Sequence, residues 1–259
     1  MKMNESQPSR RKKSTGLGGI KFDSFSLSNS LGPRHLENQD SYLTDEANLL
    51  FAVADGVGGY FGARQASVLA VATVAEQSRR ITDEATAVSC LEEIHRRIQR
   101  EARSLRYPNM GTTIALAKVM SKPGSEDRIT EGEEGKLLTA NVGDSPILLF
   151  HNEETGDYSK LYTDDSFRGE DPLLTSGIIQ YLGLETEIDF HTMVTRYGRG
   201  DILLLCSDGI TDNLLRRERS DEPSLSSIVR RHRSAEIVVR SAIERGYKPD
   251  DMTAVLVFL

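Results

Sequence analysis

The sequence predicts an α+β fold in which two antiparallel sheets stack face to face between pairs of helices, a four-layer αββα sandwich. Short apolar runs are numerous, and two stacked sheets account for their number. Helical segments occur in pairs rather than alternating with single strands, which favours α+β over a doubly wound sheet. The 259 residues are 38% hydrophobic, and no Pro-, Gly- or Ser-rich linker divides the middle of the chain, so one domain is expected.

The elements follow from the apolar patterns in chain order. Residues 1–19 are polar and basic and are expected to be a disordered tail, with a single domain spanning 20–259. Strands are predicted at 20–28, 40–44, 49–54, 111–119, 136–142, 146–150, 158–162, 190–194, 201–206 and 253–259. Helices are predicted over 62–80, from 84 to the stop at Tyr107-Pro108, and over 210–216, 224–231 and 234–245.

Aspartates recur where apolar runs begin or end, at Asp40, Asp55, Asp144, Asp208 and Asp250. Aspartate is depleted in strands, and a charge beside an apolar run is unfavourable unless compensated. If these run ends converge, the carboxylates repel one another and their pKa values rise, and a cation relieves the repulsion. No His or Cys lies among them, so the oxygen donors favour Mg²⁺ or Mn²⁺ over zinc or copper. The alternative is a set of separate turn aspartates, because turns favour Asp-Gly.

Composition argues against several classes of partner. The net charge of -7 disfavours nucleic acid. No apolar stretch is long enough to span a bilayer or to form the core of a signal peptide, so we expect no membrane association and a cytoplasmic location. Cys90 and Cys206 give no disulfide framework.

Six motifs occur in the order and relative position of those in the type 2C metal-dependent serine/threonine phosphatases, and the chain resembles that family over residues 20–259. The motifs are Asn38-Gln-Asp-Ser41, Ala54-Asp-Gly-Val-Gly-Gly59, Gly111-Thr-Thr113, Asn141-Val-Gly-Asp-Ser145, Cys206-Ser-Asp-Gly-Ile-Thr-Asp212 and Pro249-Asp-Asp-Met-Thr253. The resemblance implies the αββα fold and hydrolysis of phosphoserine and phosphothreonine by a water activated between two divalent ions, Mg²⁺ or Mn²⁺. It also implies a phosphoprotein substrate and a role in signal transduction, and we expect a monomer.

The resemblance gives the aspartates their roles. Asp55 resembles the aspartate that bridges two metals, and Gly56 the glycine whose carbonyl binds the second metal. The other expected ligands are Asp208 and Asp250 on the first metal, Asp40 on a metal-bound water, and Asp144 and Asp212 on a weaker third metal. Asp251 would lie behind these ligands, where the family more often has Asn. Asp55, Asp208 and Asp250 are therefore the expected catalytic residues, together with Arg34 as the phosphate-binding arginine.

Three departures from the family pattern matter. Val57 stands where many members have a His that is a proposed general acid. Arg34 lies one residue farther from the acidic motif than the family's arginine, and His35 competes for its role. Pro146 stands where the Gly-Asp-Ser motif usually continues with Arg.

Other functions stay open. Cys90 and Arg96 have the Cys-x5-Arg spacing of thiol-dependent phosphatases, but the residues between them are helical and acidic rather than a glycine-rich cradle, which favours a core-facing thiol. A weak or inactive member that acts as a binding or sensing module is a second possibility, and a metal-dependent nuclease or other phosphoesterase is a third. His95, on the charged second helix, is expected to face solvent.

Residues 163–187 show no clear period and are expected to be a long surface segment, of the kind that often carries function. By position they resemble the variable flap beside the family's metal site. We expect them to govern peptide selection more than bond cleavage. Phe167 and Tyr181 could line a substrate groove there, although packing against the scaffold is favoured.

Overall fold

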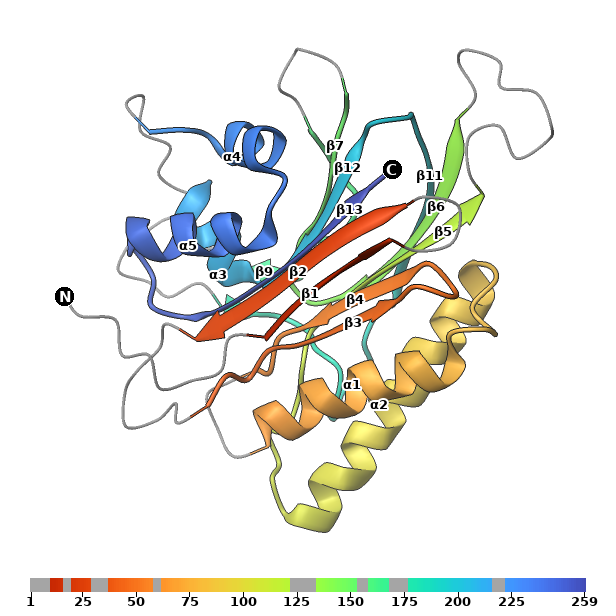
Figure 1. Ribbon diagram of the computed structural model, residues 1–259. Coiled ribbons are helices and arrows are strands. Elements are labelled where there is room, and N and C mark those ends of the chain that lie inside the picture. The colour runs from red at the N-terminus through yellow and green to blue at the C-terminus, as the bar shows by residue number, and fades with distance from the viewer. Residues whose placement is uncertain are drawn as a thin grey trace.

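Two antiparallel sheets stack face to face with helices on both outer faces, which confirms the predicted architecture (Figure 1). The computed structural model describes residues 10–15, 20–28, 37–57, 62–121, 134–152, 158–167, 177–215 and 222–259. One sheet has six strands in the order β1 (Arg10–Thr15), β2 (Lys21–Ser28), β13 (Asp251–Phe258), β12 (Ile202–Cys206), β7 (Ile147–Phe150) and β8 (Tyr158–Lys160). The other has five strands in the order β11 (His191–Tyr197), β6 (Gly135–Val142), β5 (Ile114–Ser121), β4 (Leu50–Ala54) and β3 (Ser41–Asp45).

Each sheet has its own layer of helices. Helices α1 (Ala63–Gln77) and α2 (Glu84–Leu105) pack on the five-stranded sheet, and α3 (Asp208–Leu214), α4 (Leu225–His232) and α5 (Ala235–Arg245) pack on the six-stranded sheet (Figure 1). Helix α2 begins at a capping box in which the Asp83 carboxylate accepts the Thr86 N–H. Across the described part of the chain, no helix combines the length and the apolar character that crossing a membrane requires.

Three apolar cores separate the four layers, and the alternation of side chains along the strands explains them. In β4, Leu50 and Ala52 face the α1/α2 core, whereas Phe51 and Val53 face the core between the sheets. The Phe22 and Phe51 rings meet edge to face between the two sheets, with centroids 5.7 Å apart. Because strands β4 and β12 are buried on both faces, they read as continuous apolar runs.

The structure differs from the sequence prediction most clearly at three places. Residues 10–15, expected within a disordered tail, form β1 and pair with β2 from Arg10 opposite Ser26 to Thr15 opposite Lys21, so the prediction of disorder is wrong for them. The remainder of 1–19 lies outside the described residues. Strand β5 begins at Ile114 rather than residue 111. In the segment 163–187, β9 (Ser166–Phe167) pairs with β10 (Gly177–Ile178), and residues 168–176 lie outside the described part.

Candidate active site

The ends of four strands from the two sheets converge at one edge of the sandwich. Ser41 in β3 pairs with Ala54 in β4, so Asp40 and Asp55 extend beyond the same end of the five-stranded sheet. Cys206 in β12 pairs with Ala254 in β13, so Ser207 and Asp251 lie at the same end of the six-stranded sheet. The two ends are joined by two hydrogen bonds, from the Gln39 N–H to Asp251 Oδ2 at 2.6 Å and from Ser207 Oγ to Asp40 Oδ2 at 2.8 Å.

Asp55 is held by the backbone and hydroxyl groups of the 111–113 segment. The Asp55 N–H donates to Thr113 Oγ1 at 3.0 Å, and the Asp55 carbonyl accepts from Thr112 Oγ1 and the Thr113 N–H, both at 2.8 Å. Gly56 follows in a turn so close to α1 that a Cβ there would lie 2.6 Å from the Ala63 carbonyl oxygen. The Gly111-Thr112-Thr113 motif therefore fixes the position of Asp55, and it precedes β5 rather than forming part of it.

Asp40 is almost fully buried, with 4% of its surface exposed. Its Oδ2 accepts from Ser207 Oγ, which itself accepts the Thr253 N–H at 3.0 Å. Its Oδ1 has no hydrogen-bond partner among the described residues. A buried carboxylate oxygen without a donor is unfavourable unless a ligand or ion completes its environment.

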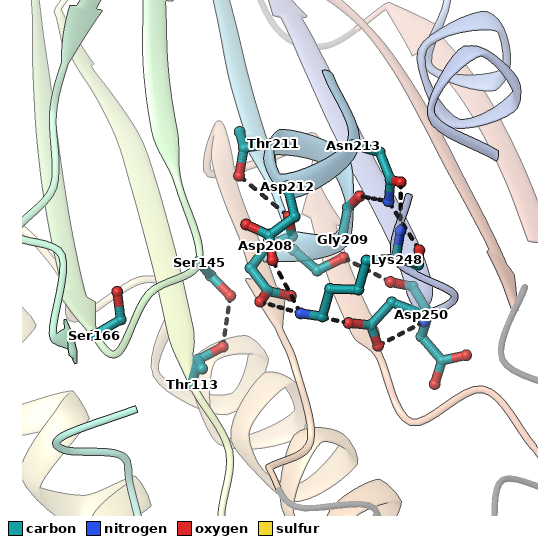
Figure 2. A network of polar contacts seen from close by, with 12 residues as sticks. Thr113, Ser145, Ser166, Asp208, Gly209, Thr211, Asp212, Asn213, Lys248 and Asp250 are labelled. Carbon is teal, nitrogen blue, oxygen red and sulfur yellow. Dashed lines mark hydrogen bonds and ion pairs between the residues drawn. The ribbon is translucent and has the colours of Figure 1, made fainter. Parts of the chain in front are cut away.

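Three more of the expected ligands surround a lysine ammonium (Figure 2). Lys248 Nζ lies 2.6 Å from Asp208 Oδ2, 2.7 Å from Asp250 Oδ2 and 3.1 Å from Asp212 Oδ2. Asp208 and Asp212 both reach it because they are four residues apart in α3 and so share one face of that helix. The sequence analysis did not select Lys248; its position two residues before Asp250 was the available signal.

Asp144 stands on a turn that the segment after β8 supports. Gly143, with φ of +98°, donates its N–H to Asp165 Oδ2 at 2.8 Å, and the Asp165 N–H donates to the Gly143 carbonyl at 3.2 Å. His191 Nε2 lies 2.9 Å from Asp165 Oδ1. On the other side of the turn, Ser145 Oγ and Thr113 Oγ1 are 2.6 Å apart, which links the turn to the support of Asp55 (Figure 2).

The carboxylates lie close enough together to disturb one another's ionisation. Burial, followed by repulsion from the surrounding aspartates, holds the pKa of Asp55 well above its usual value. Burial and the charge of Asp251 do the same to the pKa of Asp40. Burial and Asp208 raise the pKa of Asp144 to about 7, and burial raises the pKa of Asp250 although Lys248 opposes the shift. The site is therefore short of positive charge even with Lys248 in place.

The donor chemistry fits a hard divalent ion. All the expected ligands offer oxygen, the Asp40 Oδ1 atom lacks a donor, and the charges of the cluster are incompletely balanced. As they stand, the described His, Cys, Asp and Glu side chains form no group of three that could hold an ion. The ammonium of Lys248 lies among the carboxylates of Asp208, Asp212 and Asp250.

The remaining predicted residues fall into two groups. Arg34 and His35 lie outside the described residues, so the assignment of the phosphate-binding arginine stays a prediction. Cys90, in α2, faces the apolar core beneath the helices and has no exposed surface. Burial raises the pKa of its thiol to about 12, which opposes thiolate chemistry. Asp251 accepts the Gln39 N–H, and its place behind the expected ligands stays a prediction.

The chain is similar to known proteins over most of its length. The family described as Stage II sporulation protein E (SpoIIE) matches residues 45–258. "Serine/threonine phosphatase stp" of Listeria welshimeri is 28% identical over 223 residues, which cover 79% of this chain and 82% of that protein. The Mycobacterium tuberculosis serine/threonine phosphatase PstP/Ppp has the same fold, with a TM-score of 0.71 at 22% identity over 93% of this chain and 98% of that one. The catalytic domain of PstP in complex with two manganese ions gives a TM-score of 0.69 at 22% identity over 92% and 97%.

The fold is the one found in serine/threonine phosphatase structures, and the family match covers residues 45–258. The chain belongs to the SpoIIE family, and the expected membership of the type 2C phosphatase group is confirmed.

Proposed function

We propose that this protein is a metal-dependent serine/threonine phosphatase that hydrolyses phosphoserine and phosphothreonine in proteins. The observation that carries the proposal is the convergence of Asp40, Asp55, Asp208 and Asp250 at one edge of the sandwich, with a buried Asp40 oxygen that lacks a donor. Asp55 with Gly56 would hold two Mg²⁺ or Mn²⁺ ions, Asp208 and Asp250 would complete the first site, and Asp144 and Asp212 a weaker third one.

Divalent ions, when bound, supply the positive charge that makes water a better nucleophile and offsets the charge of a phosphate group. The residues of the chain itself hold the carboxylates in position. Thr112 and Thr113 fix the backbone of Asp55, and Ser207 orients Asp40 by donating to one of its two oxygens. Val57 carries no titratable group, so residue 57 does not protonate the leaving oxygen.

Substrate and location extend the proposal. The acidic composition and the phosphatase family favour phosphoprotein substrates over nucleic acid. The two cysteines are free and buried, in keeping with a reducing compartment, and we place a monomeric enzyme with a signalling role in the cytoplasm.

Two specific observations favour a second candidate function. The Lys248 ammonium contacts Asp208, Asp212 and Asp250, which are expected ligands of the first and third ions, and Val57 stands where many members of the type 2C family have a His. Both features suit a weak or inactive member that serves as a binding or sensing module on the same fold.

Hydrolysis of a phosphothreonine peptide distinguishes these functions. We expect turnover with millimolar Mn²⁺ or Mg²⁺, none in excess chelator, and none for Asp208→Asn under any condition. Cys90→Ser is the matched control and should keep full activity. Activity that survives chelator but disappears in Cys90→Ser would refute the metal-dependent mechanism. Absence of turnover at every metal concentration would favour the binding module.

A further inference from the structure

Lys248 is the one cation within 4 Å of Asp208, Asp212 and Asp250 in the part of the chain that the structure describes. Its ammonium contacts three carboxylates from two separate elements, helix α3 and the connection between α5 and β13. A lysine ammonium is positively charged at neutral pH, so all three contacts are ion pairs.

Hydrogen bonds from Asn213 fix the backbone of Lys248, and its side chain extends toward the three carboxylates. Asn213, fully buried in α3, accepts the Lys248 N–H at 2.9 Å through Oδ1 and donates to the Lys248 carbonyl at 3.0 Å through Nδ2 (Figure 2). The same Nδ2 donates to the Gly209 carbonyl at 2.7 Å. Pro249 follows and restricts the backbone of Lys248 to extended conformations.

The ammonium can nevertheless leave. The Lys248 side chain keeps 40% of its surface exposed, whereas the Asp212 side chain exposes 4%. A lysine side chain has a flexible four-carbon stem and can move its charge into solvent while its backbone stays in place. The arrangement therefore combines a fixed anchor with a movable cation.

We propose that Lys248 is an internal counter-cation that partly offsets the charge of the Asp208, Asp212 and Asp250 carboxylates in the metal-free protein and competes with divalent metal for them. The ammonium contacts the same oxygens that an ion would need, so the two cannot occupy the cluster together. Metal binding on this side requires Lys248 to withdraw to solvent, which sets a higher metal concentration for loading than the carboxylates alone would require. This inference rests on the proposed metal site.

Lys248→Met tests the inference because methionine keeps a long flexible chain and removes the charge. Isothermal titration with Mn²⁺ alone should show tighter binding to Lys248→Met than to the wild type, by about tenfold or more, because the metal no longer displaces a partly buried ion pair. The metal-free variant should unfold at a lower temperature than the wild type, because three carboxylates lose their counter-charge. Saturating Mn²⁺ should remove this deficit.

Lys160→Met is the matched control. Lys160 is exposed in the edge strand β8, and its substitution changes the net charge by the same amount. It should leave both the Mn²⁺ affinity and the metal-free unfolding temperature close to wild type. Lys248→Arg keeps the positive charge and should retain the metal-free stability. It shows whether the effect of Lys248→Met comes from the lost charge or from any substitution at this position.

The outcomes separate the two proposals. Equal or weaker Mn²⁺ binding by Lys248→Met, with measurable binding by the wild type, would overturn the competition and leave the proposed function intact. A gain of affinity equal to that of Lys160→Met would overturn it too, because a net-charge effect would then suffice. Absence of Mn²⁺ binding by both the wild type and Lys248→Met would refute the metal site, and the competition with it.

Discussion

Ser207 Oγ donates a hydrogen bond to Asp40 Oδ2 at 2.8 Å, and this contact joins the end of β12 to the start of β3 across the two sheets. Both residues are buried, so solvent cannot replace the donor if it is lost. The hydroxyl also accepts the Thr253 N–H, and this second bond fixes its orientation. The geometry of the site thus depends on a residue that would not itself contact a metal or a substrate.

Ser207→Ala should lower the free energy of unfolding by about 1–3 kcal/mol, because it leaves a buried carboxylate oxygen and a backbone N–H without their partner. Urea unfolding of the metal-free protein measures this loss. Ser227→Ala, at an exposed position in α4, is the control. Equal stability of the two variants would mean that Asp40 finds another donor.

The 163–187 segment is expected to serve recognition through its exposed apolar side chains. Phe167 is 58% exposed and Ile179 is 63% exposed, on the β9/β10 pair and directly after it. Phe167→Ser and Ile179→Ser should therefore weaken hydrolysis of phosphoproteins several-fold while activity on a small phosphate ester stays near wild type. Equal losses on both substrates would contradict a recognition role.

Asp165 separates recognition from support within the same segment. Because it accepts the Gly143 N–H beside Asp144, Asp165→Ala should reduce activity on both kinds of substrate. A linker that replaced residues 164–171 would remove Asp165 as well, so it could not test recognition alone. Selective loss on phosphoproteins in Asp165→Ala would show that the Gly143 turn does not depend on this carboxylate.

His95 should make stability depend on pH. The Gly183 N–H donates to His95 Nδ1 at 3.1 Å, and burial together with the charge of Arg96 lowers the pKa of His95 below its usual 6.5. Between the lowered value and 6.5 the unfolded chain binds more protons than the folded one, so this contribution is complete above 6.5 and is lost as pH falls. Lowering the pH from 8 to 5 should therefore reduce the unfolding temperature of the wild type relative to that of His95→Asn.

The exposed His232 in α4 provides the control for that comparison. His232→Asn should retain the pH dependence of the wild type. An unchanged pH dependence in His95→Asn would show that His95 does not contribute to it. The site aspartates have raised pKa values and act in the opposite direction, so the test compares variants rather than reading the wild type alone.

The sequence predicted the layers of this fold because each buried strand is a continuous apolar run, as in 50–54 and 202–206. It predicted the aspartates because they interrupt those runs. It did not reveal Lys248, since its partners Asp208 and Asp212 lie about forty residues earlier and their approach depends on how α3 and α5 dock. His95, expected to face solvent, is only partly exposed, because Gly183 and Phe190 contact it from an irregular segment that has no periodic pattern.

Strand β1 was missed for a related reason. Its residues, Arg10–Thr15, are polar and basic, and such a composition predicts a solvated tail. The strand exists through main-chain pairing with β2, which is itself placed by the apolar cores. Pairing at the edge of a sheet needs no apolar pattern in the added strand.

Binding of Mn²⁺ to Asp55→Asn tests most directly the claim that Asp55 is the shared centre of the site. The wild type should bind two Mn²⁺ ions per chain by isothermal titration, and Asp55→Asn should lose binding at both positions. The metal-free variant should unfold at the same temperature as the wild type or higher, because it loses a buried carboxylate that its neighbours repel. Asp189→Asn, at an exposed position, should bind as the wild type does. Wild-type Mn²⁺ affinity in a folded Asp55→Asn protein would contradict the central role of Asp55.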